Sequence, residues 1–244
     1  MRRMKLSTNT TITVENFYEK ANALMLENSY KEAVSNYLNA ILIDRNNAKS
    51  YFELGICYKN LKQYAKAVKY LETASELKEN YYEAFYELGI CHLLEGIPCG
   101  AIKNFIRAIQ INPDNPQAVL QLGIAHELCE EYDLSLMIYQ KLIENSPEFI
   151  KAYEHKSTLL MKLERYKEAY KILIQLQKIN PDYKSAFAGM GVCLEKLGKL
   201  PQAQRFYVKY LTAEPFSKEA DFIRNRLNKL RNKNYKTANL YICK

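Results

Sequence analysis

The sequence predicts an all-α protein built as a solenoid of antiparallel helix pairs. Three observations predict this fold class: a 34-residue period runs along the chain without insertion or deletion, glycine and proline are scarce, and apolar residues make up 48% of the chain. With 8 Gly and 7 Pro among 244 residues, the chain has too few turn formers for an all-β fold. A fixed period of this length is typical of stacked helical units that share a continuous core.

The period is visible in near-copies of one segment. Tyr51-Phe-Glu-Leu-Gly-Ile-Cys recurs as Phe85-Tyr-Glu-Leu-Gly-Ile-Cys and again as Val119-Leu-Gln-Leu-Gly-Ile-Ala. We therefore divide the chain into a flexible N-terminal tail, 1–13, six repeats, 14–47, 48–81, 82–115, 116–149, 150–183 and 184–217, a capping helix, 218–232, and a basic tail, 233–244. The capping helix is predicted from one apolar face made of Phe222, Ile223, Leu227 and Leu230.

Each repeat predicts two helices that approach closely. Position 8 of the first helix is always small: Ala21, Gly55, Gly89, Gly123, Ser157 and Gly191. A glycine inside a helix costs about 1 kcal/mol relative to alanine, so its recurrence needs a packing reason. We expect the second helix to lie against position 8 and to fill the space with the large residue of position 24. Proline at position 32 is expected to end the second helix, at Pro113, Pro147, Pro181 and Pro215.

These residues resemble the tetratricopeptide repeat, over residues 14–217. The main departures are Phe or Tyr in place of Trp at position 4, and large residues at position 27 of the last three repeats. The resemblance implies a right-handed α-solenoid, a superhelix whose first helices line a concave groove. It also implies that the protein is a non-enzymatic scaffold or adaptor that binds another protein.

Nine residues of the first helices are candidates for that groove. Phe52, Tyr86 and Leu120 are expected to anchor an apolar peptide or helix, and Glu53 and Glu87 to select its basic residues. The full set is Asn22, Phe52, Glu53, Ile56, Tyr86, Glu87, Ile90, Leu120 and Ile124. Some members of this family bind the C-terminal carboxylate of a partner through Lys, Asn and Arg side chains of their first helices. At the corresponding positions of this sequence only one of these residues is present, Asn22. Alternatively, the nine side chains pack between successive first helices and expose little surface.

Motifs that carry chemistry are scarce. The chain has no phosphate-binding loop and no His-Glu-x-x-His sequence. The pairs His126 with Cys129 and Cys91 with His92 could suggest a metal site. However, His92 and His126 share position 11 of the repeat, which faces inward, and Cys57, Cys91 and Cys193 share position 10, where we expect small buried residues. We therefore expect no catalysis, no cofactor, no metal and no small-molecule substrate, and the sequence does not predict the oligomeric state.

The net charge of +8 lies at the two ends of the chain. Residues 14–217 hold 24 Lys and Arg against 25 Asp and Glu. The basic C-terminal end supports an alternative function, docking on nucleic acid or an anionic membrane, through Arg224, Arg226, Lys229, Arg231, Lys233 and Lys236. A regulatory subunit of an enzyme complex is a further alternative. Without a secretory signal or apolar span, and with six cysteines interpreted as reduced thiols, the predicted location is cytoplasmic.

Overall fold

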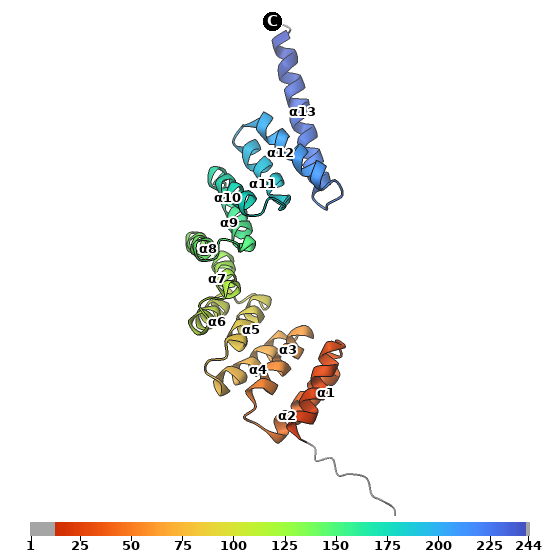
Figure 1. Ribbon diagram of the computed structural model, residues 1–244, viewed down its shortest axis with the longest axis vertical. Coiled ribbons are helices and arrows are strands. Elements are labelled where there is room, and N and C mark those ends of the chain that lie inside the picture. The colour runs from red at the N-terminus through yellow and green to blue at the C-terminus, as the bar shows by residue number, and fades with distance from the viewer. Residues whose placement is uncertain (1–12, 243–244) are drawn as a thin grey trace, which may run out of the picture. The chain divides into compact units, whose positions relative to one another are not determined.

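The computed structural model describes residues 13–242, and within that range it contains helices and loops but no strand. Thirteen α-helices follow one another in this part of the chain (Figure 1). They are α1 (Val14–Leu26), α2 (Tyr30–Ile43), α3 (Ala48–Asn60), α4 (Tyr64–Leu77), α5 (Tyr82–Leu94), α6 (Pro98–Ile111), α7 (Pro116–Leu128), α8 (Tyr132–Asn145), α9 (Ile150–Lys162), α10 (Tyr166–Ile179), α11 (Ser185–Lys196), α12 (Leu200–Ala213) and α13 (Ala220–Ile242). The all-α prediction is confirmed.

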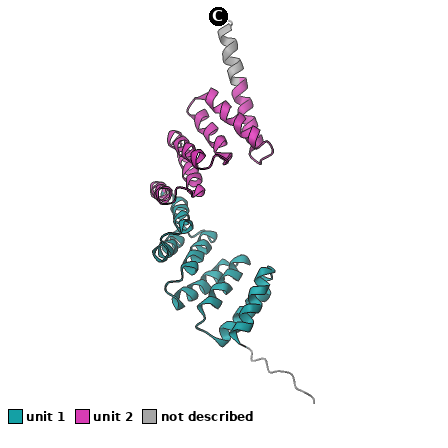
Figure 2. Cartoon of the chain, in the orientation of Figure 1, with its two compact units in different colours: residues 1–131 teal, residues 132–244 magenta. Residues whose placement is uncertain are grey.

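The chain forms two compact units, residues 1–131 and 132–244 (Figure 2). The boundary falls between α7 and α8, inside the fourth predicted repeat. Within each unit every helix packs against the next one along the chain. In unit 1 the first helices of successive repeats also touch, α3 against α5 and α5 against α7. Nearest-neighbour packing of this kind is how a helical repeat array buries its apolar faces.

The two helices of a repeat approach closely at position 8, as predicted. A Cβ atom added to Gly55 would lie 2.6 Å from Leu71 Cγ, and one added to Gly89 would lie 2.5 Å from Phe105 Cε1. Gly191 faces Tyr207 in the same way. Leu71, Phe105 and Tyr207 occupy position 24 of their repeats, and all three are 0% exposed. Glycine is therefore retained because the partner side chain fills the space of its missing Cβ.

The turn between the two helices has the same geometry in every repeat. Position 15 adopts a left-handed conformation, with φ between 58° and 76°, at Asn28, Lys62, Gly96, Glu130, Glu164 and Gly198. The following N–H donates to the carbonyl five residues earlier, for example Gln63 to Tyr58 at 2.9 Å. This is the Schellman ending of a helix, which usually needs glycine at the left-handed position. The turn recurs every 34 residues, so the backbone carries the same period as the side chains. The side-chain pattern alone did not predict this turn geometry.

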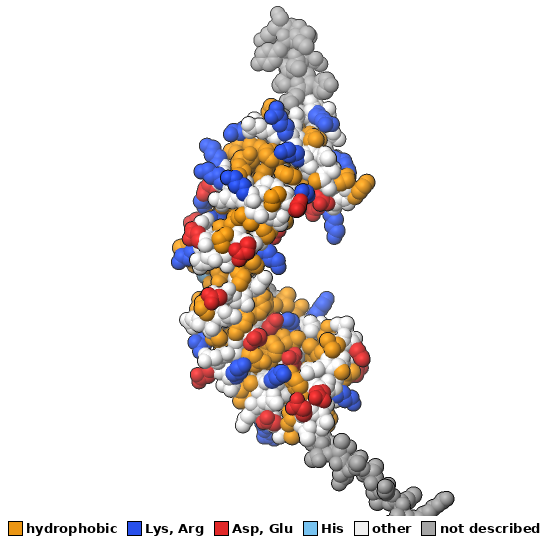
Figure 3. Space-filling model, in the orientation of Figure 1, with side chains coloured by type: hydrophobic (Ala, Val, Ile, Leu, Met, Phe, Trp, Pro, Cys, Tyr) orange, Lys and Arg blue, Asp and Glu red, His pale blue; other side chains and the backbone are white. Residues whose placement is uncertain are grey.

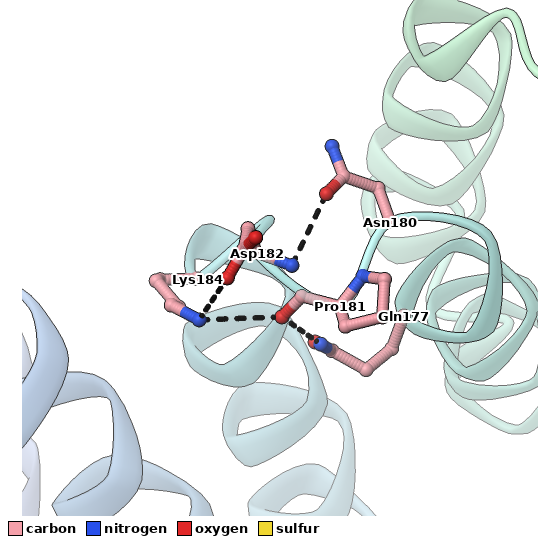
Figure 4. Close-up of polar contacts among 5 residues, drawn as sticks. All are labelled: Gln177, Asn180, Pro181, Asp182 and Lys184. Atoms are coloured by element: carbon pink, nitrogen blue, oxygen red, sulfur yellow. Dashed lines mark hydrogen bonds and ion pairs between the residues drawn. The ribbon is translucent and has the colours of Figure 1, made fainter.

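The proline predictions at position 32 are also confirmed, since α6, α8, α10 and α12 each end two residues before their proline. Figure 4 shows one of these turns, at Pro181. The Pro181 carbonyl accepts hydrogen bonds from Gln177 Nε2 at 2.7 Å and Lys184 Nζ at 3.3 Å. The Asp182 N–H donates to Asn180 Oδ1 at 3.1 Å, and Lys184 also pairs with Asp182 at 3.0 Å. These bonds link the end of α10 to the start of α11.

The capping helix differs in length from the prediction of 218–232. Helix α13 begins at Ala220 and continues past 232 to Ile242, into the segment that was expected to be a basic tail. Ile223, Leu227 and Leu230 are at most 5% exposed, as expected for a capping face. Phe222 was assigned to the same face, but it is 57% exposed, so that assignment is wrong. The predicted tail residues 1–12, 243 and 244, and the side chains beyond Asn232, lie outside the described part of the chain.

An ion pair fastens the capping helix to the last repeat. Arg226 Nε lies 2.9 Å from Glu195 Oε2 on α11 and 3.1 Å from Tyr207 Oη on α12. The Tyr207 hydroxyl also donates to Glu195 at 2.6 Å. Arg226, which the sequence placed in a basic docking surface, is thus held by contacts inside unit 2.

Replacement of Gly89 by valine tests the close approach of the two helices. Because the added side chain would meet the Phe105 ring, we expect Gly89→Val to lower the free energy of unfolding by about 1–3 kcal/mol. Urea unfolding followed by circular dichroism measures this change. Ala65→Val on the exposed side of α4 is the control, which should cost only about 0.5 kcal/mol in helix propensity. Equal losses in the two variants would contradict the packing account.

Candidate peptide-binding face

The nine predicted groove residues all belong to unit 1 and lie on α1, α3, α5 and α7, the first helices of the first four repeats. We call them the first-helix face. Eight of the nine are half-buried, which leaves part of each side chain open to solvent. Figure 3 shows hydrophobic and acidic side chains next to one another on the visible side of unit 1. The ninth residue, Leu120, is only 2% exposed, so it belongs to the core and its predicted role as an anchor is wrong.

Phe52 and Tyr86 are exposed on one side and packed on the other. The Phe52 ring centroid lies 5.1 Å from that of Tyr81, at the start of α5. The Tyr86 ring lies 6.0 Å from Tyr82 and 5.9 Å from Phe105. Aromatic rings at these separations attract one another, and this attraction adds to the stabilisation from burying their surface. Both sequence interpretations therefore hold in part: the two aromatic residues join neighbouring helices and remain partly exposed to solvent.

Glu53 is the most unusual residue of the face. Burial raises the pKa of its carboxyl group, although Lys49 and a hydrogen bond from Tyr18 both oppose that shift. No ion pair holds Glu53 within residues 13–232, whose side chains the structure describes. A carboxylate that is partly removed from water and held in no ion pair is costly to ionise, and the more distant charge of Lys49 offsets this cost only in part. A positive charge brought to this site from outside would relieve that cost.

Phenol groups surround Glu53. Burial first, and the Glu53 charge second, raise the pKa of Tyr18 to about 12 and raise the pKa values of Tyr37 and Tyr81 as well. The Tyr37 hydroxyl donates to Asn22 Oδ1 at 2.6 Å, so Asn22 lies next to these phenols. We call Tyr18, Asn22, Tyr37, Glu53 and Tyr81 the Glu53 cluster. Glu53 is the only carboxyl group of this cluster.

Glu87 was predicted to have the same role as Glu53, but its surroundings differ. Lys59 Nζ lies 2.6 Å from Glu87 Oε2, with the two side chains 21% and 19% exposed. Lys59, on α3, thus already supplies the cation that a partner would bring to Glu87 on α5. The acidic row of the sequence therefore contains one carboxylate with an internal partner and one without.

Sequence reasoning missed several members of this site. Lys59 was not among the predicted groove residues, because its contact with Glu87 depends on how α3 and α5 stack. Tyr81 is the last residue of its repeat, just before α5, and no helical periodicity includes it. Tyr18 lies one 34-residue period before Phe52, and this spacing is the signal that could have added it to the predicted face.

Among the described residues, no group of three or more His, Cys, Asp or Glu side chains is arranged to hold a metal ion. His126, half of one pair considered from the sequence, has its Nδ1 atom 2.5 Å from Glu131 Oε2. In the same part of the chain, none of the helices is both long enough and apolar enough to span a membrane.

Comparisons with known proteins agree with this architecture. A tetratricopeptide-repeat family model matches residues 150–183, and a model described as regulator of microtubule dynamics protein 1-3 matches residues 13–87. A search of curated proteins found no match.

Several solved structures have the same fold. The protein YrrB, described as a tetratricopeptide-repeat protein with an unusual peptide-binding site, aligns at 18% identity and a TM-score of 0.61, covering 78% of this chain and 97% of its own. PilW, a type IV pilus biogenesis factor, aligns at 18% identity and 0.67, covering 88% and 99%. The C-terminal part of a repeat protein from Cytophaga hutchinsonii aligns at 17% identity and 0.72, covering 81% and 79%.

Each of the six 34-residue repeats contributes a helix pair, with the same close contact at position 8 wherever it is described and the same turn at position 15. Together with the family match over residues 150–183 and the structural neighbours, this shows that the described part of the chain has the all-α fold of tetratricopeptide-repeat proteins, with thirteen helices in tandem.

Proposed function

We propose that this protein is a non-enzymatic interaction module that binds an apolar peptide or helix carrying a basic residue on the first-helix face of unit 1. The observation that carries the proposal is the Glu53 carboxylate, which is half-buried among phenols, has a raised pKa and lacks an ion-pair partner in the described chain. A lysine or arginine of the partner would stabilise its charged form. The adjoining Phe52, Ile56, Tyr86 and Ile90 would contact apolar side chains of the same peptide.

The pairing of Glu87 with Lys59 sharpens this proposal. Since Lys59 already neutralises Glu87, the partner needs a cation at Glu53 rather than a row of cations along the whole face. Ile124 extends the apolar surface onto α7, and Asn22 places an amide next to Glu53 through its bond to Tyr37. The likeness to YrrB, whose description names a peptide-binding site, supports a peptide as the ligand. Such binding is expected in the cytoplasm.

A second candidate function is favoured by a basic cleft in unit 2. Arg205, Lys209 and Arg231 line a cleft of about 560 Å³ between α12 and α13, together with Pro201, Val208 and Leu227. Figure 3 shows Lys and Arg side chains near this end of unit 2. Two other basic residues of the helix are already paired inside the unit, Arg226 with Glu195 and Arg224 with Asp221. Lys233 and Lys236 lie outside the side chains that the structure describes. The cleft suits a polyanion, either nucleic acid or an anionic membrane.

The raised pKa of Glu53 predicts how its replacement changes stability with pH. The folded state holds a proton on Glu53 that the unfolded state loses near its ordinary pKa of about 4.3, so this group destabilises the fold increasingly as pH rises above that value. Glu53→Gln removes this pH-dependent destabilisation. The thermal midpoint of the variant relative to the native chain should therefore rise between about pH 4 and about pH 7. Differential scanning calorimetry at the two pH values measures the difference.

Glu87→Gln is the matched control for this experiment. It removes a carboxylate that is paired with Lys59, so its midpoint should not rise relative to the native chain over the same pH range. A Glu53→Gln variant that behaves like Glu87→Gln would show that burial does not make Glu53 costly to ionise.

Selection from a display library of random short peptides tests the proposed binding. We expect the full chain to enrich peptides that combine apolar residues with Lys or Arg. Glu53→Gln keeps the shape of the side chain and should weaken their binding at least about tenfold, the effect of losing one hydrogen bond to a charged group. Phe52→Ala with Tyr86→Ala should also weaken it, although both rings support packing. Fluorescence anisotropy with a labelled selected peptide gives the affinities.

Glu72→Gln, at an exposed site on α4, is the control and should leave the affinity unchanged. The proposal fails if no peptide is enriched, or if the selected peptides bind the native chain, Glu53→Gln and the double variant equally well.

For the second candidate function, deletion of residues 232–244 tests whether the basic cleft binds without the end of the C-terminal helix. If the cleft binds polyanions, the truncated chain should keep its affinity for phosphatidylserine vesicles or duplex DNA, and this affinity should fall steeply with added salt. Arg205→Gln combined with Lys209→Gln should reduce it. Flotation and filter-binding assays measure the two ligands. Binding that is lost on truncation, or that ignores salt, would contradict a role for the cleft.

A further inference from the structure

Two cysteines that lie far apart in the sequence meet on the surface of unit 1. Cys99 lies in the first turn of α6 and Cys129 directly follows α7, yet their Sγ atoms are 3.7 Å apart. They are separated by 30 residues in the chain. Cys99 is exposed and Cys129 is partly exposed, so a reagent in solution can reach the pair.

The other described cysteines form a clear contrast. Cys57, Cys91 and Cys193 are each 0% exposed. Burial raises the pKa of Cys57 and Cys91 to about 12 and that of Cys193 to about 11, which leaves almost no thiolate at neutral pH. Since the thiolate is the reacting form, these three thiols are chemically inert in the folded protein. They fill space between helices, as the sequence predicted.

We propose that Cys99 and Cys129 are a reversible modification site, at which a small-molecule disulfide such as glutathione disulfide oxidises the pair to an intramolecular disulfide. The two sulfurs need to approach by roughly 1.7 Å to reach the bond length of about 2.05 Å. Rotation of the exposed Cys99 side chain can supply much of this movement. Helices α6 and α7 already pack against each other, so the bond joins elements that are neighbours in the reduced protein.

The chemistry is two successive thiol–disulfide exchanges. The Cys99 thiolate, which is the more exposed, attacks one sulfur of glutathione disulfide and releases one glutathione thiolate. The Cys129 thiolate then attacks the Cys99 sulfur of the mixed disulfide and releases the second glutathione. The protein loses two protons and two electrons, and the glutathione disulfide takes up both. Burial and the hydrogen bond with Cys99 raise the pKa of Cys129, so it is better suited to the second, intramolecular step.

The disulfide would tie the second helix of the third repeat to the first helix of the fourth. Each interface between neighbours contributes separately to the stability of a repeat array, so one covalent link stabilises that junction in particular. The link also closes a loop of 30 residues, which restricts the unfolded chain.

Oxidation of the full chain in glutathione redox buffers tests the proposal. Samples are quenched with acid, alkylated in denaturant and digested without reduction. We expect a monomer that has lost two hydrogen atoms, a linked peptide containing Cys99 and Cys129, and full alkylation of Cys57, Cys91 and Cys193. Dithiothreitol should reverse the change. Peptide mapping follows Cys243 separately. Stable glutathione adducts on both cysteines, links only between chains, links through the buried cysteines, or no reaction would each overturn the proposal.

Two serine variants test the assigned order of the steps. In Cys129→Ser the glutathione adduct on Cys99 should persist, since no second thiol can displace it. In Cys99→Ser the adduct on Cys129 should form more slowly than that on Cys99. The oxidised native chain should also unfold at a higher temperature than identically treated Cys129→Ser. An equal or lower midpoint would contradict the claim that α6 and α7 accommodate the bond in their present positions.

Discussion

The close approach of two antiparallel helices at one small residue is the constraint on which the rest of the fold depends. Gly55, Gly89 and Gly191 each leave the space of a Cβ atom, and a buried side chain of the second helix fills it. This contact fixes the distance and rotation of the two helices in a pair. The next pair then packs on the first, so the side chains that reach the surface on successive first helices are determined as well.

The first-helix face is a consequence of that geometry. In unit 1, α3 contacts α5 and α5 contacts α7, which brings side chains at corresponding positions of neighbouring repeats together. Lys59 and Glu87 meet through this stacking and neutralise each other. Glu53 meets phenols instead, and burial raises its pKa. Two glutamates at the same repeat position thus have opposite electrostatic states, and this difference carries the functional proposal.

Much of the fold could be predicted from the sequence because its determinants repeat every 34 residues. The small residues at position 8 and the prolines at position 32 are local signals, and both have the predicted structural role. The left-handed residues of the turns could not be predicted, because Lys62, Glu130 and Glu164 are not residues that favour this conformation. The division into two units falls inside the fourth repeat, which is the first with a large residue at position 27, but that departure alone did not predict a division.

The candidate site was less predictable, since its properties arise between repeats. The sequence selected the helices that carry the face, but it could not distinguish the half-buried Ile124 from the buried Leu120 on the same helix. The salt bridge of Glu87 and the meeting of Cys99 with Cys129 depend on how one repeat stacks on the next. The extent of α13 to Ile242 and the exposure of Phe222 likewise depend on where the cap meets the last repeat.

Hydrogen–deuterium exchange of the full chain, with and without a saturating selected peptide, tests the central claim most directly. The account predicts slower exchange in α1, α3 and α5, which carry the Glu53 cluster and the aromatic anchors, and little change in α2, α4 and α6. Protection confined to those second helices, or to α12 and α13, would contradict the account, because it would place the partner away from the first-helix face.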